Sequence, residues 1–169
     1  MARPLKRRRG SAPSRNDIGQ ALQRLNEGRF EDARALCERL LKRQPADRDA
    51  LHLLGLTHLK LGQDAEAVDV LERASVAARD NAELLNNLAS AYRRVGRLTD
   101  SVAAADRALA VDSGFARAHL NAALALEASG NLIGAVERQR AACAADPGFA
   151  AARRSLAELL SRLGRARES

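Results

Sequence analysis

Residues 50–62, ALHLLGLTHLKLG, and residues 64–78, DAEAVDVLERASVAA, decide the fold of this chain. Each stretch places apolar and small residues at helical spacing, so each predicts an α-helix. Gly62 ends the first stretch, and glycine readily adopts the left-handed conformation that terminates a helix. We therefore expect a helix, a short turn at Gly62 and a second helix packed against the first.

The same arrangement recurs along the chain with a period of 34 residues. Glycines keep this register five times, at Gly28, Gly62, Gly96, Gly130 and Gly164. A column of small residues keeps the same step, at Ala21, Gly55, Ala89, Ala123 and Ala157. Small residues at matched positions let two helices approach to roughly 8–10 Å. One hairpin cannot bury its apolar face alone, so neighbouring hairpins must stack into a solenoid.

Composition agrees with helices and separates a basic tail from the body. Aromatic residues make up only 2% of the 169 residues, so Leu, Ala and Val must form the core, which favours close-packed helices over a β-sandwich. The net charge is +7, but basic residues without any acidic ones gather at the N-terminal end, at Arg3, Lys6, Arg7, Arg8, Arg9 and Arg15. The rest is near neutral, so a nucleic-acid surface across the body is not indicated.

The 34-residue pattern resembles the tetratricopeptide repeat, a helix–turn–helix with small residues at positions 8, 20 and 27 of each unit. We call such positions slots. The resemblance implies an all-α fold, a right-handed α-solenoid of four helix–turn–helix units with a C-terminal capping helix. The expected parts are a disordered basic tail (1–13), four units across 14–149 (14–47, 48–81, 82–115 and 116–149), and a capping helix with a short tail (150–169). The slot-4 tryptophan of the family is absent, and its slot-11 tyrosine survives only as Tyr92.

Slots 2, 6, 9 and 13 of each first helix form one stripe, and the family resemblance implies that this stripe lines a concave groove. The candidate binding residues on it are Leu56, Lys60, Asn87, Ser90, Arg94, Arg117, Asn121 and Leu124. Asn87 and Asn121 share slot 6, and their amides can bond to the backbone of an extended peptide. The repeats are most similar to those of bacterial sulfotransferases and O-linked N-acetylglucosamine transferases, where asparagines at this slot hold peptide backbone. Alternatively, paired asparagines only stabilise stacking. Asn86, at slot 5, is expected to pack on a neighbour or contact solvent.

These residues predict a non-enzymatic scaffold or adaptor that binds an extended peptide or helix of another protein. Lys60, Arg94 and Arg117 would favour an acidic ligand, and Leu56 and Leu124 would supply apolar contact. The sequence contains no phosphate-binding glycine loop, HExxH or GxSxG motif, and no His or Cys residues with metal-ligand spacing, so we expect no cofactor.

Two other functions stay open. The chain could be a stand-alone or truncated substrate-docking region of a sulfotransferase or glycosyltransferase. It could instead be a nucleic-acid or membrane adaptor acting through its basic tail, at Arg3, Lys6, Arg7, Arg8 and Arg9. No stretch approaches the length of a transmembrane helix, and no apolar run follows the basic residues as in a secretory signal, so we expect a cytoplasmic protein.

Overall fold

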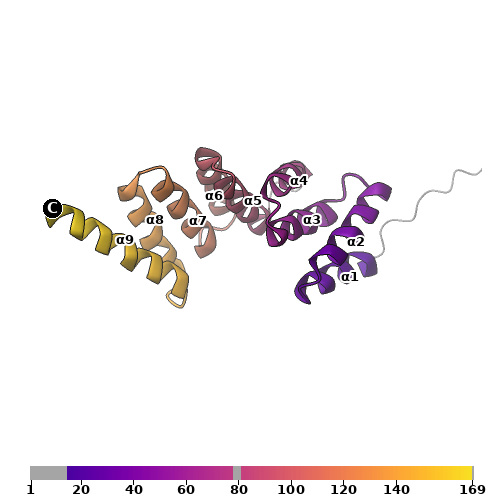
Figure 1. Ribbon diagram of the computed structural model, residues 1–169, viewed down its shortest axis with the longest axis horizontal. Helices are drawn as coiled ribbons and strands as arrows, with labels where there is room; N and C mark the ends of the chain where they lie inside the picture. The colour runs from indigo at the N-terminus through magenta and orange to yellow at the C-terminus, as the bar shows by residue number, and fades with distance from the viewer. Residues whose placement is uncertain (1–14, 78–80, 169) are drawn as a thin grey trace, which may run out of the picture.

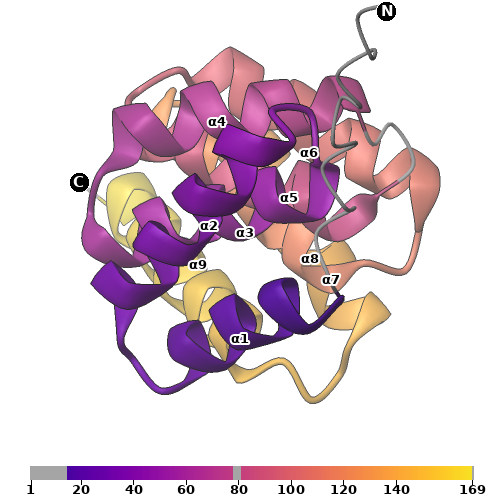
Figure 2. The same ribbon diagram turned by 90° about the vertical axis from the view of Figure 1, so that its right-hand side faces the viewer.

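The computed structural model describes residues 15–77 and 81–168, and this part of the chain folds entirely into helices and turns. The helices are α1 (Arg15–Asn26), α2 (Phe30–Arg43), α3 (Arg48–Leu61), α4 (Asp64–Ala77), α5 (Ala82–Arg94), α6 (Leu98–Val111), α7 (Ala116–Ala128), α8 (Leu132–Ala145) and α9 (Ala150–Glu168). They follow one another along the long axis (Figure 1), and the end view shows them wound around it (Figure 2). The all-α solenoid is confirmed. The predicted basic tail lies outside the described residues.

Local sequence sets where the first helices begin. Asp47 precedes α3 in extended conformation, and its side chain accepts a hydrogen bond from the backbone N–H of Ala50 at 2.8 Å. Asn81 caps α5 in the same way, accepting from the N–H of Leu84 at 2.9 Å. Such caps satisfy N–H groups that have no partner within the helix. The first helices of the second and third hairpins therefore begin at defined residues.

The turn glycines end the first helices as predicted, with one exception. Gly62 has a φ of +74° and Gly96 a φ of +80°, and both follow the last turn of a first helix. Gly28 and Gly130 have the same left-handed conformation. The 34-residue register also predicts that Gly164 ends the final helix, and this prediction is wrong, because α9 continues through Gly164 to Glu168. Within the described residues α9 packs on α8 of the preceding hairpin, and no second helix of its own unit follows it.

Small residues bring the two helices of a hairpin together. A Cβ added to Gly55 of α3 would lie 2.5 Å from Cγ and Cδ2 of Leu71 on α4, far inside normal contact. Ala89 and Ala123 occupy the same slot in the next two units and are fully buried. Ala157, also in this column, is exposed, because the described part of the chain contains no second helix of the same unit to cover it. The small residue therefore serves close packing only where a complete hairpin exists.

Successive first helices also pack directly on one another. Contacts join α1 to α3, α3 to α5, and α5 to α7, in addition to those within each hairpin. The stripe of slots 2, 6, 9 and 13 therefore runs across helices that lie next to each other. This arrangement decides which polar side chains of different units can meet.

Candidate functional site

Polar contacts between residues 35 apart mark the line where neighbouring first helices meet, which we call the seam. Slot 5 or 12 of one unit contacts slot 6 or 13 of the next. The contacts are Asn87 Nδ2 to His52 Nε2 (3.0 Å), Asn121 Nδ2 to Asn86 Oδ1 (2.8 Å), Arg94 Nη1 to the Leu59 carbonyl (2.9 Å), and Arg162 to Glu127. The seam thus has a regular register of 35 residues, one more than the repeat.

The adjacent asparagines of α5 contact opposite neighbours. Asn86 is only 5% exposed and accepts the hydrogen bond of Asn121 on α7, whereas Asn87 is half-buried and contacts His52 on α3. Of the two expectations for Asn86, packing on a neighbour is the one observed. A buried amide without a partner would be destabilising, and the seam supplies the partner. The Asn-Asn pair therefore links three successive units.

The surroundings of His52 favour the neutral ring, which can accept this hydrogen bond. Burial lowers the pKa of His52 below its ordinary value, although the carboxylates of Glu83 and Asp49 act in the opposite direction. A neutral imidazole carries one acceptor nitrogen, and Nε2 faces the Nδ2 of Asn87. The contact thus fixes the orientation of the Asn87 amide.

Asn87 and Asn121 retain capacity for a ligand. Each contributes Nδ2 to the seam, and no described residue donates a hydrogen bond to either Oδ1. Both side chains are half-buried, as are Ser90, Leu56 and Leu124 on the same stripe. The stripe therefore presents two oriented amide oxygens among partly exposed apolar and hydroxyl groups. Whether these residues bind a ligand stays a prediction.

The three predicted cations differ in how far they are engaged. The Nε of Arg94 lies 2.8 Å from Oδ1 of Asp64, and its Nη1 donates a hydrogen bond to the Leu59 carbonyl. The guanidinium of Arg94 therefore already has partners within the fold. Arg117 is 58% exposed, lies over the ring of Phe115 at 5.1 Å and is 3.9 Å from Glu83. Lys60 is exposed and makes no ion pair with any described residue. Lys60 and Arg117 are thus more available than Arg94.

One hollow is lined in part by Arg117, one of the predicted groove residues. It measures about 330 Å³ and is lined by Phe115, Phe149, Arg117, Asp146 and the short turn at Gly114 and Ala116. Its two aromatic rings occupy the last slot of successive units. An apolar side chain of a ligand that contacts Arg117 could enter it.

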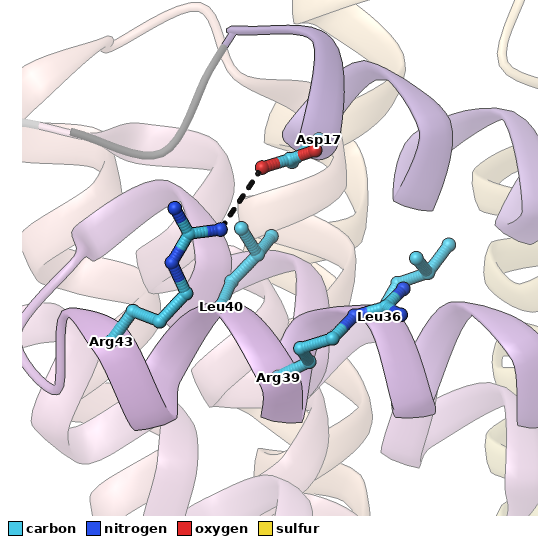
Figure 3. Close-up of a pocket in the computed structure, with 5 residues that line it drawn as sticks. All are labelled: Asp17, Leu36, Arg39, Leu40 and Arg43. Atoms are coloured by element: carbon cyan, nitrogen blue, oxygen red, sulfur yellow. Dashed lines mark ion pairs between the residues drawn. The ribbon is translucent and has the colours of Figure 1, made fainter. Parts of the chain in front are cut away.

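A second hollow, of about 310 Å³, lies between α1 and α2 (Figure 3). It is lined by Asp17, Leu36, Arg39, Leu40 and Arg43, and Arg43 points toward Asp17 across 3.7 Å. Two arginines and one aspartate line it, so the formal charge of its lining is +1. It contains none of the predicted groove residues.

Sequence reasoning missed the seam residues at slots 5 and 12. His52 and Asn86 occupy slot 5 and Leu59 and Glu127 occupy slot 12, and their partners in the next unit are seen only in the structure. The available signal was their spacing, since slots 5 and 12 are two helical turns apart and share one face. Among residues 15–77 and 81–168, no cluster of His, Cys, Asp or Glu could hold a metal, and no helix is long and apolar enough to cross a membrane.

The comparisons with known proteins agree with this architecture. Two models of the tetratricopeptide repeat match residues 24–92 and 86–148. The chain belongs to the tetratricopeptide repeat family. The comparison with curated proteins found no match. The predicted likeness to sulfotransferase and glycosyltransferase repeats in particular stays a prediction.

Solved structures with the same fold include MamA and two proteins whose descriptions mention a peptide or a peptide-binding site. MamA is 24% identical, with 85% of this chain and 84% of that chain covered and a TM-score of 0.78. YrrB, described as having an unusual peptide-binding site, is 19% identical, with 92% and 80% covered and a TM-score of 0.74. The first repeat domain of Spaghetti (RPAP3), bound to the HSP90 peptide SRMEEVD, is 23% identical, with 69% and 93% covered and a TM-score of 0.65.

Proposed function

We propose that this chain is a protein-interaction scaffold whose first-helix stripe holds an extended segment of a partner protein. The observation that carries the proposal is the pair of oriented amides, Asn87 and Asn121, one unit apart. Each is fixed by a bond from Nδ2 to the preceding unit and keeps Oδ1 for another donor. An extended backbone offers N–H donors at regular intervals, so two such acceptors can hold it without reading its side chains.

The family supports this function. Tetratricopeptide repeats serve as interaction modules, and the structural neighbours YrrB and Spaghetti are both described with peptides. Arg117 and Lys60 would favour acidic residues in the bound segment, and Leu56 and Leu124 would contact its apolar side chains. No observation on the described residues favours a docking region of a transferase, and the basic tail that would carry the third function lies outside them.

The test is a capture experiment in which partner proteins are identified by mass spectrometry after nuclease treatment. The baits are the intact chain, the Asn87→Ala/Asn121→Ala variant and a chain lacking residues 1–14. A fourth bait, His52→Ala/Asn86→Ala, is the matched control, because it removes the same two seam bonds from the other side. It leaves the groove amides in place.

We expect partners to be lost with Asn87→Ala/Asn121→Ala and to be captured more weakly, but still captured, with His52→Ala/Asn86→Ala, which keeps both amides but no longer fixes their orientation. Equal loss with both pairs would mean that the asparagines only stabilise stacking. If partners are lost only with the chain lacking residues 1–14, the N-terminal tail and not the first-helix stripe binds them. Circular dichroism of each bait at the assay temperature checks that all four are folded.

A further inference from the structure

Arg93, on α5, carries a guanidinium that has no hydrogen-bond or ion-pair partner among residues 15–77 and 81–168. Its Nε is buried and donates no hydrogen bond to any described residue, although the side chain as a whole is only partly buried. Burial, followed by the neighbouring charge of Arg94, lowers its pKa from the ordinary arginine value. Burying part of an unpaired charge is unfavourable. The position therefore calls for a negative group that the described residues do not supply.

The seam register shows where that group is missing. At the preceding seam, Arg94 of slot 13 bonds to slot 12 at Leu59, and at the following seam Arg162 of slot 13 pairs with slot 12 at Glu127. At the middle seam, the same offset of 35 residues places Arg93 of slot 12 opposite Ala128. Ala128 is exposed and has no polar side-chain group, so this place in the seam supplies no partner for the cation of Arg93.

This place is continuous with the proposed groove. Asn86 and Asn121 meet at the same seam between α5 and α7, and each lies seven residues before Arg93 or Ala128. Seven residues of α-helix span about 10 Å, which an extended segment covers in about three residues. A ligand held at Asn121 can therefore reach Arg93.

Building on the proposed function, we infer that Arg93 binds a carboxylate of the bound segment, supplied by an Asp or Glu about three residues from the position held at Asn121. A carboxylate would approach end-on to the two terminal nitrogens, because Nε is already covered. Bonds between ions of this type are among the stronger hydrogen bonds in proteins. Arg93 would then select acidic partners, while the asparagines hold their backbone.

The experiment uses a phage-displayed library of random dodecapeptides selected on the full chain, on Arg93→Gln and on Arg107→Gln. Arg107 is an exposed arginine of α6, so its variant removes the same charge outside the groove. A peptide enriched on the full chain is then synthesised with each of its acidic residues in turn replaced by the matching amide. Its affinity is measured for the three proteins and for Asn87→Ala/Asn121→Ala.

We expect Asp and Glu to be enriched more strongly on the full chain and on Arg107→Gln than on Arg93→Gln, in which only Lys60 and Arg117 remain to favour acidic residues. One acidic-to-amide change should weaken binding to the full chain about tenfold and leave binding to Arg93→Gln nearly unchanged. Arg93→Gln should melt no lower than the full chain, because it removes an unpaired charge. Arg93→Lys should retain part of the preference for acidic peptides, since lysine keeps the positive charge but lacks the paired N–H donors of a guanidinium.

Equal enrichment of acidic residues on Arg93→Gln, or equal effects of the peptide change on both proteins, would overturn the inference. So would a clear fall in the melting temperature of Arg93→Gln, which would reveal a partner within the fold. If binding is lost in Asn87→Ala/Asn121→Ala but unchanged in Arg93→Gln, the proposed function stands and the role of Arg93 is rejected. If binding is lost in Arg93→Gln but unchanged in Asn87→Ala/Asn121→Ala, the carboxylate site stands and the backbone contact of the asparagines is rejected. If no peptide is enriched on the full chain, both proposals are rejected.

Discussion

Asn121 donates a hydrogen bond of 2.8 Å to Asn86, a residue one unit earlier in the chain and one slot earlier in its helix. Because Asn86 is buried, this bond both satisfies its amide and fixes the offset between α5 and α7. The same geometry joins Asn87 to His52 at the preceding seam. The seam is thus a stacking device that also orients the groove amides.

The seam bond should be measurable as a coupling between Asn86 and Asn121. We expect the single variants Asn86→Ala and Asn121→Ala each to lower the free energy of unfolding, and the double variant to lower it by less than their sum. The coupling should be about 0.5–1.5 kcal/mol, the usual net value of such a bond. Urea unfolding of the four proteins gives the value. Strict additivity would mean that the bond contributes nothing to stability.

Gly55 should not tolerate even one added methyl group. The Cβ of Gly55→Ala would lie 2.5 Å from the side chain of Leu71, so α3 and α4 must separate or Leu71 must move. Overpacking of this kind costs about 1–3 kcal/mol. Gly19→Ala is the matched control, because Gly19 lies in a helix with nothing within 4 Å of the added atom. The control should raise stability by up to about 1 kcal/mol, as expected from helix propensity.

Gly96 and Gly164 share a register but should respond oppositely to substitution. Gly96 has a φ of +80°, so Gly96→Val should lower the free energy of unfolding by at least about 1 kcal/mol. Gly164 lies inside α9 with free space around it, so Gly164→Ala should be neutral or stabilising. Thermal unfolding followed by circular dichroism measures both. A harmless Gly96→Val would show that the turn does not depend on left-handed backbone.

The stability of the chain should fall in mild acid through His52. Its pKa is lower in the folded protein than the ordinary value of 6.5, so the unfolded chain binds more protons in this range. The free energy of unfolding should therefore decrease as the pH falls below about 6.5, until the ring is protonated in both states. His52→Gln should be less sensitive than the wild type between pH 7 and pH 5. Parallel curves for the two proteins would mean that the ring titrates normally.

A hollow beside Leu126 should accept a tyrosine. Tyr92 occupies slot 11 of α5, where its hydroxyl donates to Glu72 at 2.8 Å and Arg97 lies over its ring. Leu126 is at the same slot one unit later, and it lines a hollow of about 320 Å³ together with Asp106, the counterpart of Glu72.

Leu126→Tyr should therefore raise the free energy of unfolding by about 0.5–2 kcal/mol, the usual gain from filling a cavity. The matched control is Leu84→Tyr, which should be destabilising because Leu84 is fully buried. Chemical unfolding of both variants tests the prediction. A less stable Leu126→Tyr would mean that the hollow cannot take the ring in this orientation.

The sequence by itself determined the hairpins. A repeated glycine, a column of small residues and helical apolar spacing are local signals, and α-helices form from hydrogen bonds between residues four apart. The turn at Gly62 and the close contact at Gly55 could therefore be predicted without tertiary information. The stripe of candidate residues could also be placed, since it follows from the 3.6-residue period.

Only the tertiary structure decided what those residues contact. The sequence repeats every 34 residues, but the seam pairs residues 35 apart, because stacked helices settle with an offset that side-chain packing sets. That offset joins Asn86 to Asn121, and Arg94 is committed to Asp64 by a contact between units. By the same register it leaves Arg93 opposite Ala128. Contacts between units depend on how complete hairpins fit together, and no local pattern in one unit contains that information.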